Sequence, residues 1–512
     1  MFDDKKRNKA TSGSGSNNEK INDGIAGYIG MSAPETPKYL LTNNFLLDYF
    51  SNGTEMSPQY NFELFEEKGV LAFEDDINRD SLKNSFDSFM ECYLGENTMR
   101  RENRRLSKGT HFYFPFSPEM LTENGSPNLR HMLFHMQNLD DDFNYTDMQK
   151  KLYNYVFNNI SGINHILKIL LHSQEEVITN KSYPGREISV NFWAMLSSAE
   201  RKRIKRLGEN LNGDLNTLLT HEYFGKLDFY RKYNYLSILL TSYIIQYIVF
   251  RGDANTGILC KGAPADSRLN GVIHRACCNN YVEIRNLFPK LLQRYYEEVV
   301  KKVANDDGTI PVEARANHIY IKEMDFVEFA TGILGSRSKM NDLSYDMLVH
   351  AFSLTPDSTT DIPIDDFVVR YINLTGSKRG SVLSKISSTL PTSGRQIEMI
   401  FPKGNAKHKY FAMSASLTEF YVRLYLADKG HVYDYLDNFI QYLQSKYRIV
   451  LTKTNDTERL LRSVRPKLSA QEFSKNKSAF IDTLNAANCL VKLSDSGYVI
   501  TLPEKKGVLK LV

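Results

Sequence analysis

Hydrophobic residues recur at three- and four-residue spacings through most of the first two thirds of the chain. The pattern is present in residues 81–94, 147–171, 214–250, 281–304 and 322–333. One apolar stripe repeated every three or four residues is typical of an amphipathic helix with one buried face. We therefore predict a mainly helical body over residues 37–335.

Two segments depart from this helical pattern. Residues 1–36 are rich in Ser, Gly, Asn and Lys, a composition that predicts a disordered tail. Residues 235–250 form the most apolar run of the chain, but the run has 16 residues and includes two serines, a threonine and a glutamine. A membrane-spanning helix needs about 20 apolar residues. The run is therefore interpreted as a buried helix or strand pair of the core.

The pattern changes after residue 340. Three helices are predicted at 343–352, 364–374 and 381–390, the last ending at Pro391. Two short strand-like runs follow, 396–401 and 409–413, and a basic turn at 402–408 joins them. This order of helices and hairpin predicts a winged-helix-like unit over residues 340–415.

The same order recurs in residues 416–505. Helices are predicted at 416–426, 432–447 and within 468–488, and strands at 490–493 and 498–502. The turn between the strands, Ser494–Gly497, is rich in Ser, Asp and Gly, which favours a hairpin. The predicted fold is therefore mainly α, with a large helical body followed by tandem winged helix-turn-helix units. Ile481 and Leu484 are expected to be buried under the second hairpin.

Charge is unevenly distributed along the chain. The formal net charge is only +4, but residues 370–512 hold 23 Lys and Arg against 11 Asp and Glu. This part therefore carries +12, and the preceding part carries −8. A basic module attached to an acidic one is typical of proteins that bind a polyanion and also contact other proteins.

The basic residues of the winged-helix units are the predicted contacts to the phosphates of double-stranded DNA. In the first unit they are Lys378, Arg379, Lys385, Arg395, Lys403, Lys407, His408 and Lys409. In the second they are Arg462, Arg465, Lys467, Lys475 and Lys477. The turn at 402–408 and its flank hold the densest charge, so we expect this wing to contribute to binding. The alternative is a solvated surface on modules that dock protein.

Sequence signatures of other chemistry are incomplete. Gly376–Ser381 has a glycine spacing one residue short of a Walker A loop. Residues 251–278 contain Cys260, His274, Cys277 and Cys278, but without the paired spacing of a zinc site, and we interpret this segment as an ordered loop before a helix near His274. The acids at 361–366 fit the first turn of a helix. No cofactor, metal or catalytic residue is predicted.

Four stretches carry a family resemblance: DSRLNGVIHRACCNNYVEIRNLF, LSYDMLVHAFSL, STLPTSGRQIEMIFPKGNAKHKYFA and NAANCLVKLSDSGYVITLP. They resemble accessory subunits encoded in bacterial antiphage defence islands, of the methylation-associated defence type. The second possibility is the analogous subunit of phosphorothioation-dependent restriction. The resemblance implies a component without motor activity that works beside a separate ATPase or nuclease.

These observations lead to one expected function and two alternative functions. The five cysteines are scattered, which favours a reducing, cytoplasmic location. We expect a cytoplasmic, non-catalytic DNA-binding and assembly subunit of a multi-protein defence complex, with no membrane partner. The rivals are a metal-dependent nuclease whose site is formed only in the fold, and a protein scaffold that uses its winged helices for docking.

Overall fold

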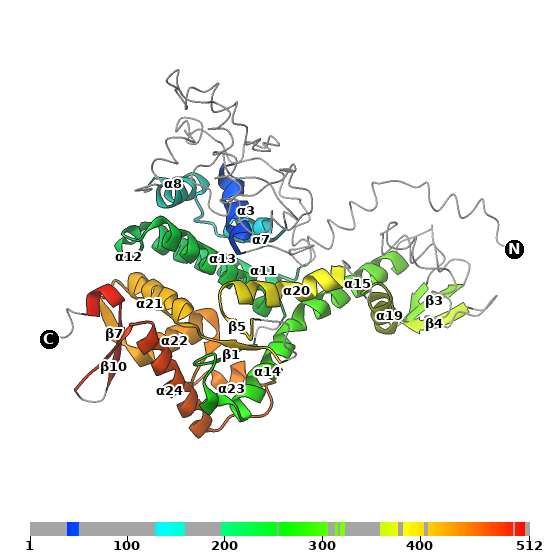
Figure 1. Ribbon diagram of the computed structural model, residues 1–512. Helices are drawn as coiled ribbons and strands as arrows, with labels where there is room; N and C mark the ends of the chain where they lie inside the picture. Colours follow the sequence, from blue (N-terminus) through cyan, green and yellow to red (C-terminus); the bar gives the residue numbers. More distant parts are fainter. Residues whose placement is uncertain are drawn as a thin grey trace, which may run out of the picture. The chain divides into compact units, whose positions relative to one another are not determined.

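The structure is a computed structural model, shown in Figure 1. It describes residues 38–50, 128–158, 196–252, 255–305, 313–315, 318–322, 359–376, 382–403, 408–494 and 497–506. The chain divides into two compact units. The smaller unit is centred on residues 285–389, and the larger unit combines 35–186, 202–284 and 390–512. This division cuts across the boundaries predicted from the sequence, because parts of the helical body and of the basic C-terminal region lie together in the larger unit.

The smaller unit packs helices beside an antiparallel sheet. Its strands are β2 (Glu313–Arg315), β3 (His318–Lys322) and β4 (Thr359–Pro363), in that order across the sheet. Helix α15 (Leu287–Asn305) packs against α19 (Ile364–Gly376) and β2. The buried residues of α19 recur at three- and four-residue spacing, as the sequence predicts for a helix with one apolar face.

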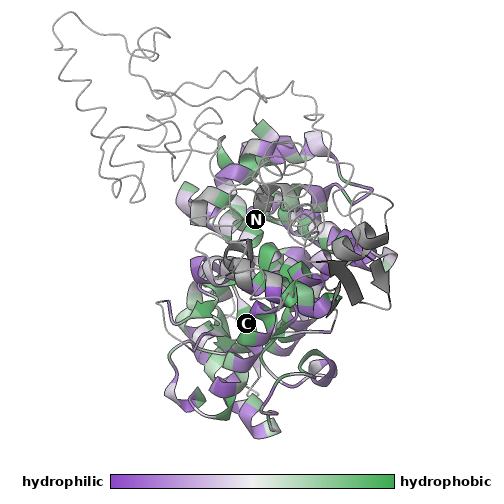
Figure 2. Cartoon of the chain, turned by 90° about the vertical axis from the view of Figure 1, so that its right-hand side faces the viewer, coloured by the Kyte–Doolittle hydropathy of each residue, from purple (hydrophilic) through white to green (hydrophobic). Residues whose placement is uncertain are grey.

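Helices form one part of the larger unit. They are α3 (Lys38–Phe50), α7 (Asn128–Gln137), α8 (Tyr145–Val156), α11 (Ser198–Thr220), α12 (Glu222–Gly225) and α13 (Phe229–Gly252). Helix α13 is central, because it packs against α3, α7 and α8 and also against a helix of the C-terminal region. Figure 2 shows hydrophobic and hydrophilic residues interspersed along the helices.

Helix α13 contains the most apolar run of the sequence. Among the described residues, Phe229–Arg251 is the one stretch long and apolar enough to cross a membrane, yet 89% of its most apolar window is buried inside the structure. Its polar side chains have partners within the unit, since Ser237 hydrogen-bonds Thr42 at 2.7 Å and Gln246 donates to the Tyr447 carbonyl at 2.6 Å. The prediction of a buried core element is confirmed.

A four-stranded mixed sheet joins distant parts of the larger unit. Strand β1 (Ile258–Lys261) lies between β6 (Tyr410–Ala412) and β8 (Ile449–Val450) and runs parallel to both. Strand β5 (Ile400–Phe401) pairs antiparallel with β6. All four β1 residues are buried, as expected for a central strand covered on both faces. The chain then forms η2 (Ser267–Leu269) and α14 (Val272–Arg285).

A second sheet lies among the C-terminal helices. The elements follow the order α21 (Ala415–Lys429), β7 (Tyr433–Tyr435), α22 (Leu436–Tyr447), α23 (Thr457–Leu460), α24 (Ala470–Ala486), β9 (Leu490–Lys492), β10 (Tyr498–Thr501) and η3 (Pro503–Lys505). The antiparallel sheet has the strand order β7-β10-β9. The main-chain N–H of Leu493 donates to the Gly497 carbonyl at 2.9 Å, so the hairpin predicted at Ser494–Gly497 is confirmed.

Local sequence signals set the ends of two of these helices. Helix α21 ends at Gly430, whose φ of 66° lies in the left-handed region that glycine adopts without strain. Helix α24 begins with a capping box, in which Ser469 and Glu472 each accept from the other's main-chain N–H. The capping box fixes where α24 starts.

Several local predictions are wrong. Residues 251–278 do not form a loop up to His274, because they contain β1, which becomes a strand through pairing with segments about 150 and 190 residues further along. Helix α20 (Val382–Gln396) does not end at Pro391 but continues past it, since a proline removes only one helical N–H. The helix predicted at 432–447 begins with strand β7.

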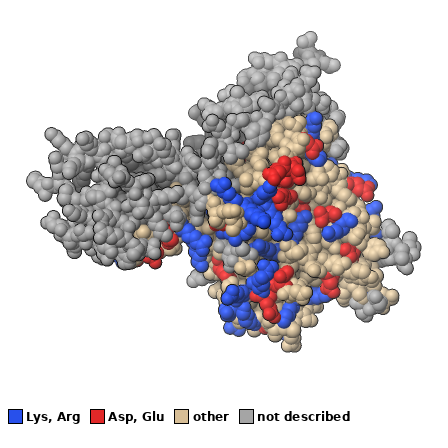
Figure 3. Space-filling view, turned by 180° about the vertical axis from the view of Figure 1, so that it is seen from behind, with Lys and Arg blue, Asp and Glu red and all other residues tan. Residues whose placement is uncertain are grey.

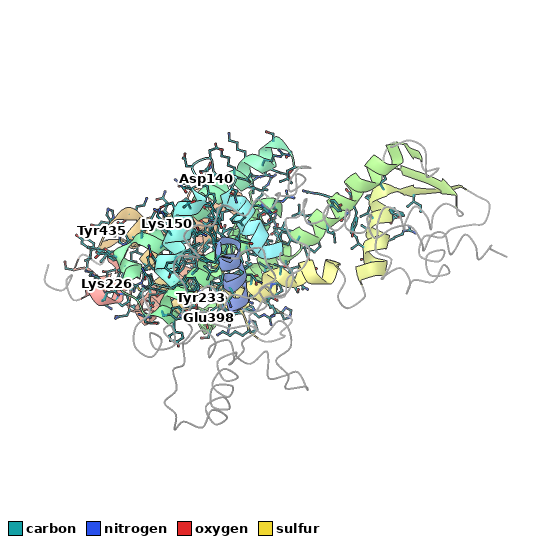
Figure 4. All side chains as sticks on the ribbon, turned by 90° about the horizontal axis from the view of Figure 1, so that it is seen from above. Asp140, Lys150, Lys226, Tyr233, Glu398 and Tyr435 are labelled. Atoms are coloured by element: carbon teal, nitrogen blue, oxygen red, sulfur yellow. The ribbon has the colours of Figure 1, made fainter. Side chains whose placement is uncertain are left out.

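The predicted hairpin between residues 396 and 413 is present but is no separate wing. Strands β5 and β6 are antiparallel neighbours, and β6 pairs on its other side with β1. Figure 4 places Glu398, just before β5, well apart from Tyr435 at the end of β7. The two hairpins therefore belong to different sheets. The helix predicted at 343–352 lies outside the described residues.

Candidate nucleic-acid interface

The segment from α23 to the start of α24 is anchored by apolar side chains. Leu460, Leu461 and Val464 are buried in a cluster that also includes residues of β1, β8, α14 and α24. These buried side chains face the core. The residues between and directly after them face solvent. Arg462, Arg465 and Lys467 are exposed. The segment 459–467, here called the basic segment, therefore presents cations on a fixed support.

Main-chain carbonyl groups orient two of these cations. One terminal nitrogen of Arg465 donates to the carbonyls of Arg462 at 2.9 Å and Val464 at 3.0 Å. The ammonium of Lys467 donates to the carbonyls of Leu461 at 2.9 Å and Arg462 at 2.8 Å. A carbonyl oxygen orients a cation without neutralising it. Neither side chain has a carboxylate partner within ion-pair distance among the described residues.

The electrostatics of the basic segment favour an anion. Loss of some hydration and the neighbouring Arg465 charge lower the pKa of the exposed Lys467, while Glu458 and Glu283 act against them. The Arg462 guanidinium has no polar partner among the described residues, and only Arg459 at the start of the segment forms an ion pair, with Asp456 at 3.2 Å. Two like charges close together attract a shared anion such as a phosphate.

Helix α14, which precedes the basic C-terminal region in the sequence, also contacts the basic segment. Asn279 donates its side-chain amide to the Arg465 carbonyl at 2.7 Å. Arg275 lies one turn earlier on the same exposed face of α14 and has no polar side-chain partner in the described part of the chain. Sequence reasoning missed both residues, although their spacing of four on a helix was the signal that could have paired them.

Helix α24 carries two predicted DNA contacts, Lys475 and Lys477, which differ in whether they form an ion pair. Lys475 is exposed and forms no ion pair within the described ranges, whereas Lys477 is ion-paired with Asp437. Gln471, Ser474 and Ser478 are exposed on the same side of the helix as Lys475. These short polar side chains leave the main chain of α24 accessible beside one free positive charge.

The predicted contacts of the first winged-helix-like unit are described only in part. Lys403 is ion-paired with Glu398 at 2.5 Å, and Arg395 donates to the Pro391 carbonyl at 2.9 Å. His408 is exposed, and Lys409 is partly exposed. Lys378, Arg379 and Lys407 lie outside the described residues, as does the side chain of Lys385. Lys403 is therefore the one lysine of this hairpin for which the described residues show a carboxylate partner.

Positive charge is also clustered on the surface of the described part. Figure 3 shows Lys and Arg side chains gathered in a band on one face of the described part, with Asp and Glu beside them. Within the residues that the structure describes, no group of three or more His, Cys, Asp and Glu side chains is arranged to hold a metal ion. The described polar surface therefore offers cations for an anionic partner.

The chain has no match in comparisons with protein-family models, with curated proteins or with solved structures. A function is therefore inferred from the residues of this chain and their geometry.

Proposed function

We propose that the chain is a non-catalytic DNA-binding and assembly subunit of a multi-protein antiphage defence complex in the bacterial cytoplasm. The observation that carries the proposal is the basic segment, whose Arg465 and Lys467 are oriented by main-chain carbonyls and stay unneutralised. The family resemblance of the four stretches supports the defence context. The four described cysteines are free and buried, which fits a reducing compartment.

The order of elements in residues 415–501 supports the winged-helix interpretation of the second unit. Helix α21 and strand β7 are followed by α22, β8, α23 and α24 and then by the closing hairpin β9-β10, and β7 pairs with β10. In a winged helix-turn-helix, the helix before the hairpin is the one that enters a groove of DNA. Here that helix is α24, with Lys475 on its exposed side.

One feature departs from a compact helix-turn-helix. The segment between α22 and α24 contains β8 and α23, where a tight turn is usual. This insertion carries the basic segment, so the additional cations lie directly before α24 in the chain. We infer that the basic segment contacts the phosphate backbone while α24 approaches the groove.

The test compares free cations with paired ones. The double variant Arg462→Gln, Lys475→Gln removes two charges that have no described partner, and neither change removes a described hydrogen bond. The matched control Lys403→Gln, Lys477→Gln removes two lysines that are already ion-paired with Glu398 and Asp437. Fluorescence anisotropy of a labelled DNA duplex across a salt series measures the affinity of each protein.

Removing one phosphate-neutralising cation reduces the slope of log affinity against log salt by about 0.9. We expect the first double variant to flatten the slope by up to about 2 units and to weaken binding to all sequences alike, and the control to change the slope by less than half as much. Titrations of the first variant that superimpose on wild type contradict the proposal. Such a result favours the protein scaffold if the variant also loses a partner subunit that co-purifies with the wild type.

A further inference from the structure

The buried face of α14 and the apolar anchors of the basic segment lie in one cluster of side chains, to which α24 also contributes. On α14 the members are Ile273, Ala276 and Cys277, and on α24 they are Phe473 and Ala479. Close packing against shared neighbours fixes the position of each element. The outer sides of α14, the basic segment and α24 are therefore held together as one surface.

The outer side of α14 carries three exposed residues in line. They are Arg275, Asn279 and Val282, spaced by four and three positions, which places them on one face of the helix. Seven residues of helix span about 10 Å. Glu283, the one acidic residue of α14, is partly buried, and its charge acts on Lys467 of the basic segment. The exposed face therefore carries one positive charge and no negative charge.

The side chains at the two ends of this face are available to a ligand. The Arg275 guanidinium has no polar partner among the described residues. Val282 is 50% exposed, although valine is among the residues most often buried. Between them, Asn279 donates to the Arg465 carbonyl at 2.7 Å and so joins this face directly to the basic segment.

The chemistry of this face matches the base edges of double-stranded DNA. Arginine donates two hydrogen bonds to O6 and N7 of guanine, and an apolar side chain contacts the C5-methyl group of thymine. The major groove of B-DNA is wide enough to admit an α-helix. Phosphates line both sides of the groove, and the cations of the basic segment lie beside α14 where they can contact them. This charge complementarity favours DNA as the occupant of the face.

We propose that α14 enters the major groove of double-stranded DNA, where Arg275 contacts a guanine and Val282 contacts a thymine. The proposal rests on the DNA binding proposed above and adds base recognition to it. Base pairs are stacked about 3.4 Å apart, so the two side chains reach bases about three pairs apart. Asn279 connects α14 to the basic segment, whose phosphate contacts set the position of the helix along the groove.

The first test uses the full-length wild type and modified DNA. A library of random duplexes is bound to the protein, and the retained sequences are determined. We expect a preferred sequence with a guanine and a thymine about three base pairs apart. Replacing the guanine by 7-deazaguanine removes the N7 acceptor and should weaken binding about tenfold or more. Replacing the thymine by deoxyuridine removes the methyl group and should weaken binding roughly fourfold.

Variants then assign each base to its side chain. Arg275→Ala should bind the 7-deazaguanine duplex as well as the unmodified one, because it lacks the guanidinium that contacts N7. Val282→Ser should likewise lose its response to deoxyuridine. The control is Arg206→Ala on α11, which removes an exposed arginine that forms no ion pair within the described ranges and should keep both responses. All three positions are exposed, so the thermal midpoints of the variants should equal that of the wild type.

The outcomes separate base recognition from DNA binding itself. A wild type that binds duplexes but retains no preferred sequence overturns the role of α14 and leaves the DNA-binding proposal intact. Modified bases that weaken the wild type and the matching α14 variant equally also overturn it. The variant Arg462→Gln, Lys475→Gln should weaken binding to all sequences while keeping the preferred one. A wild type that binds no duplex overturns both proposals.

Discussion

The side-chain amide of Asn476 on α24 donates to the main-chain carbonyl of Cys260 in β1, at 2.9 Å and across 216 residues of sequence. The same amide nitrogen donates to the Leu451 carbonyl at 2.9 Å, and the amide oxygen accepts from Gly262. Asn476 is 0% exposed. One buried asparagine thus joins the C-terminal helix to the end of the central strand and to the segment after β8.

Replacing Asn476 by leucine should destabilise the chain strongly. The change keeps the branched shape of the side chain but leaves buried main-chain groups without partners, each at a cost of about 1–3 kcal/mol. We expect the free energy of unfolding in urea to fall by at least about 3 kcal/mol. The control is Lys475→Ala on the exposed side of α24, with a change within about 0.5 kcal/mol. Equal stabilities of the two variants contradict the role of the amide.

Leu484 and Ile481 give a test of how α24 packs. Both were predicted to be buried under the hairpin, and Leu484 is 0% exposed, whereas Ile481 is only partly buried. Leu484→Ala should lower the free energy of unfolding by about 2–5 kcal/mol, because it leaves a cavity in the core. Ile481→Ala is the matched control and should cost clearly less. Thermal unfolding of the full chain followed by circular dichroism measures both, and the reverse order of effects contradicts this packing.

The ion pair between Arg423 and Glu504 should make stability depend on pH. Arg423 is 1% exposed and contacts Glu504 at 2.5 Å, with the Tyr223 carbonyl at 2.9 Å as a further acceptor. Burial disfavours the charge of Glu504, but the hydrogen bond and the charge of Arg423 outweigh it and lower the pKa of Glu504 below 4.5. A lowered carboxyl pKa stabilises the folded state above the ordinary pKa, and this stabilisation disappears as the pH falls through the folded value.

Glu504→Gln should therefore lower the thermal midpoint at pH 7, because it leaves Arg423 with weaker neutralisation. The difference from the wild type should shrink as the pH falls below 4.5, where Glu504 becomes protonated. Lys505→Gln, next to it in η3, is the control for a charge change without this buried contact. A midpoint difference that stays constant between pH 7 and acidic pH contradicts the assignment.

Lys475 and Lys477 test the electrostatic interpretation within one helix. Lys475 has no described partner, and Lys477 is ion-paired with Asp437. Lys475→Gln should flatten the salt dependence of duplex binding by up to about 0.9, the value for one neutralised phosphate. Lys477→Gln should change it less, because Asp437 already neutralises that lysine. Two equal slopes in the anisotropy titration mean that the ion pair does not decide which lysine reaches DNA.

Elements that depend on local signals were predictable from the residues alone. The buried face of α24 was readable because its apolar positions repeat every three or four residues, whereas α13 was readable as the most apolar run of the chain. The turn at Ser494–Gly497 was readable because its residues favour tight turns. The cluster of positive charge after residue 370 also follows from composition alone.

Contacts between distant segments determine which elements form the sheets and which cations have carboxylate partners. Strand β1 has four residues, and nothing local distinguishes it from a loop until β6 and β8 supply its hydrogen-bond partners. Lys403 and Arg465 are equally basic in sequence, but Glu398 neutralises the first and main-chain carbonyls hold the second.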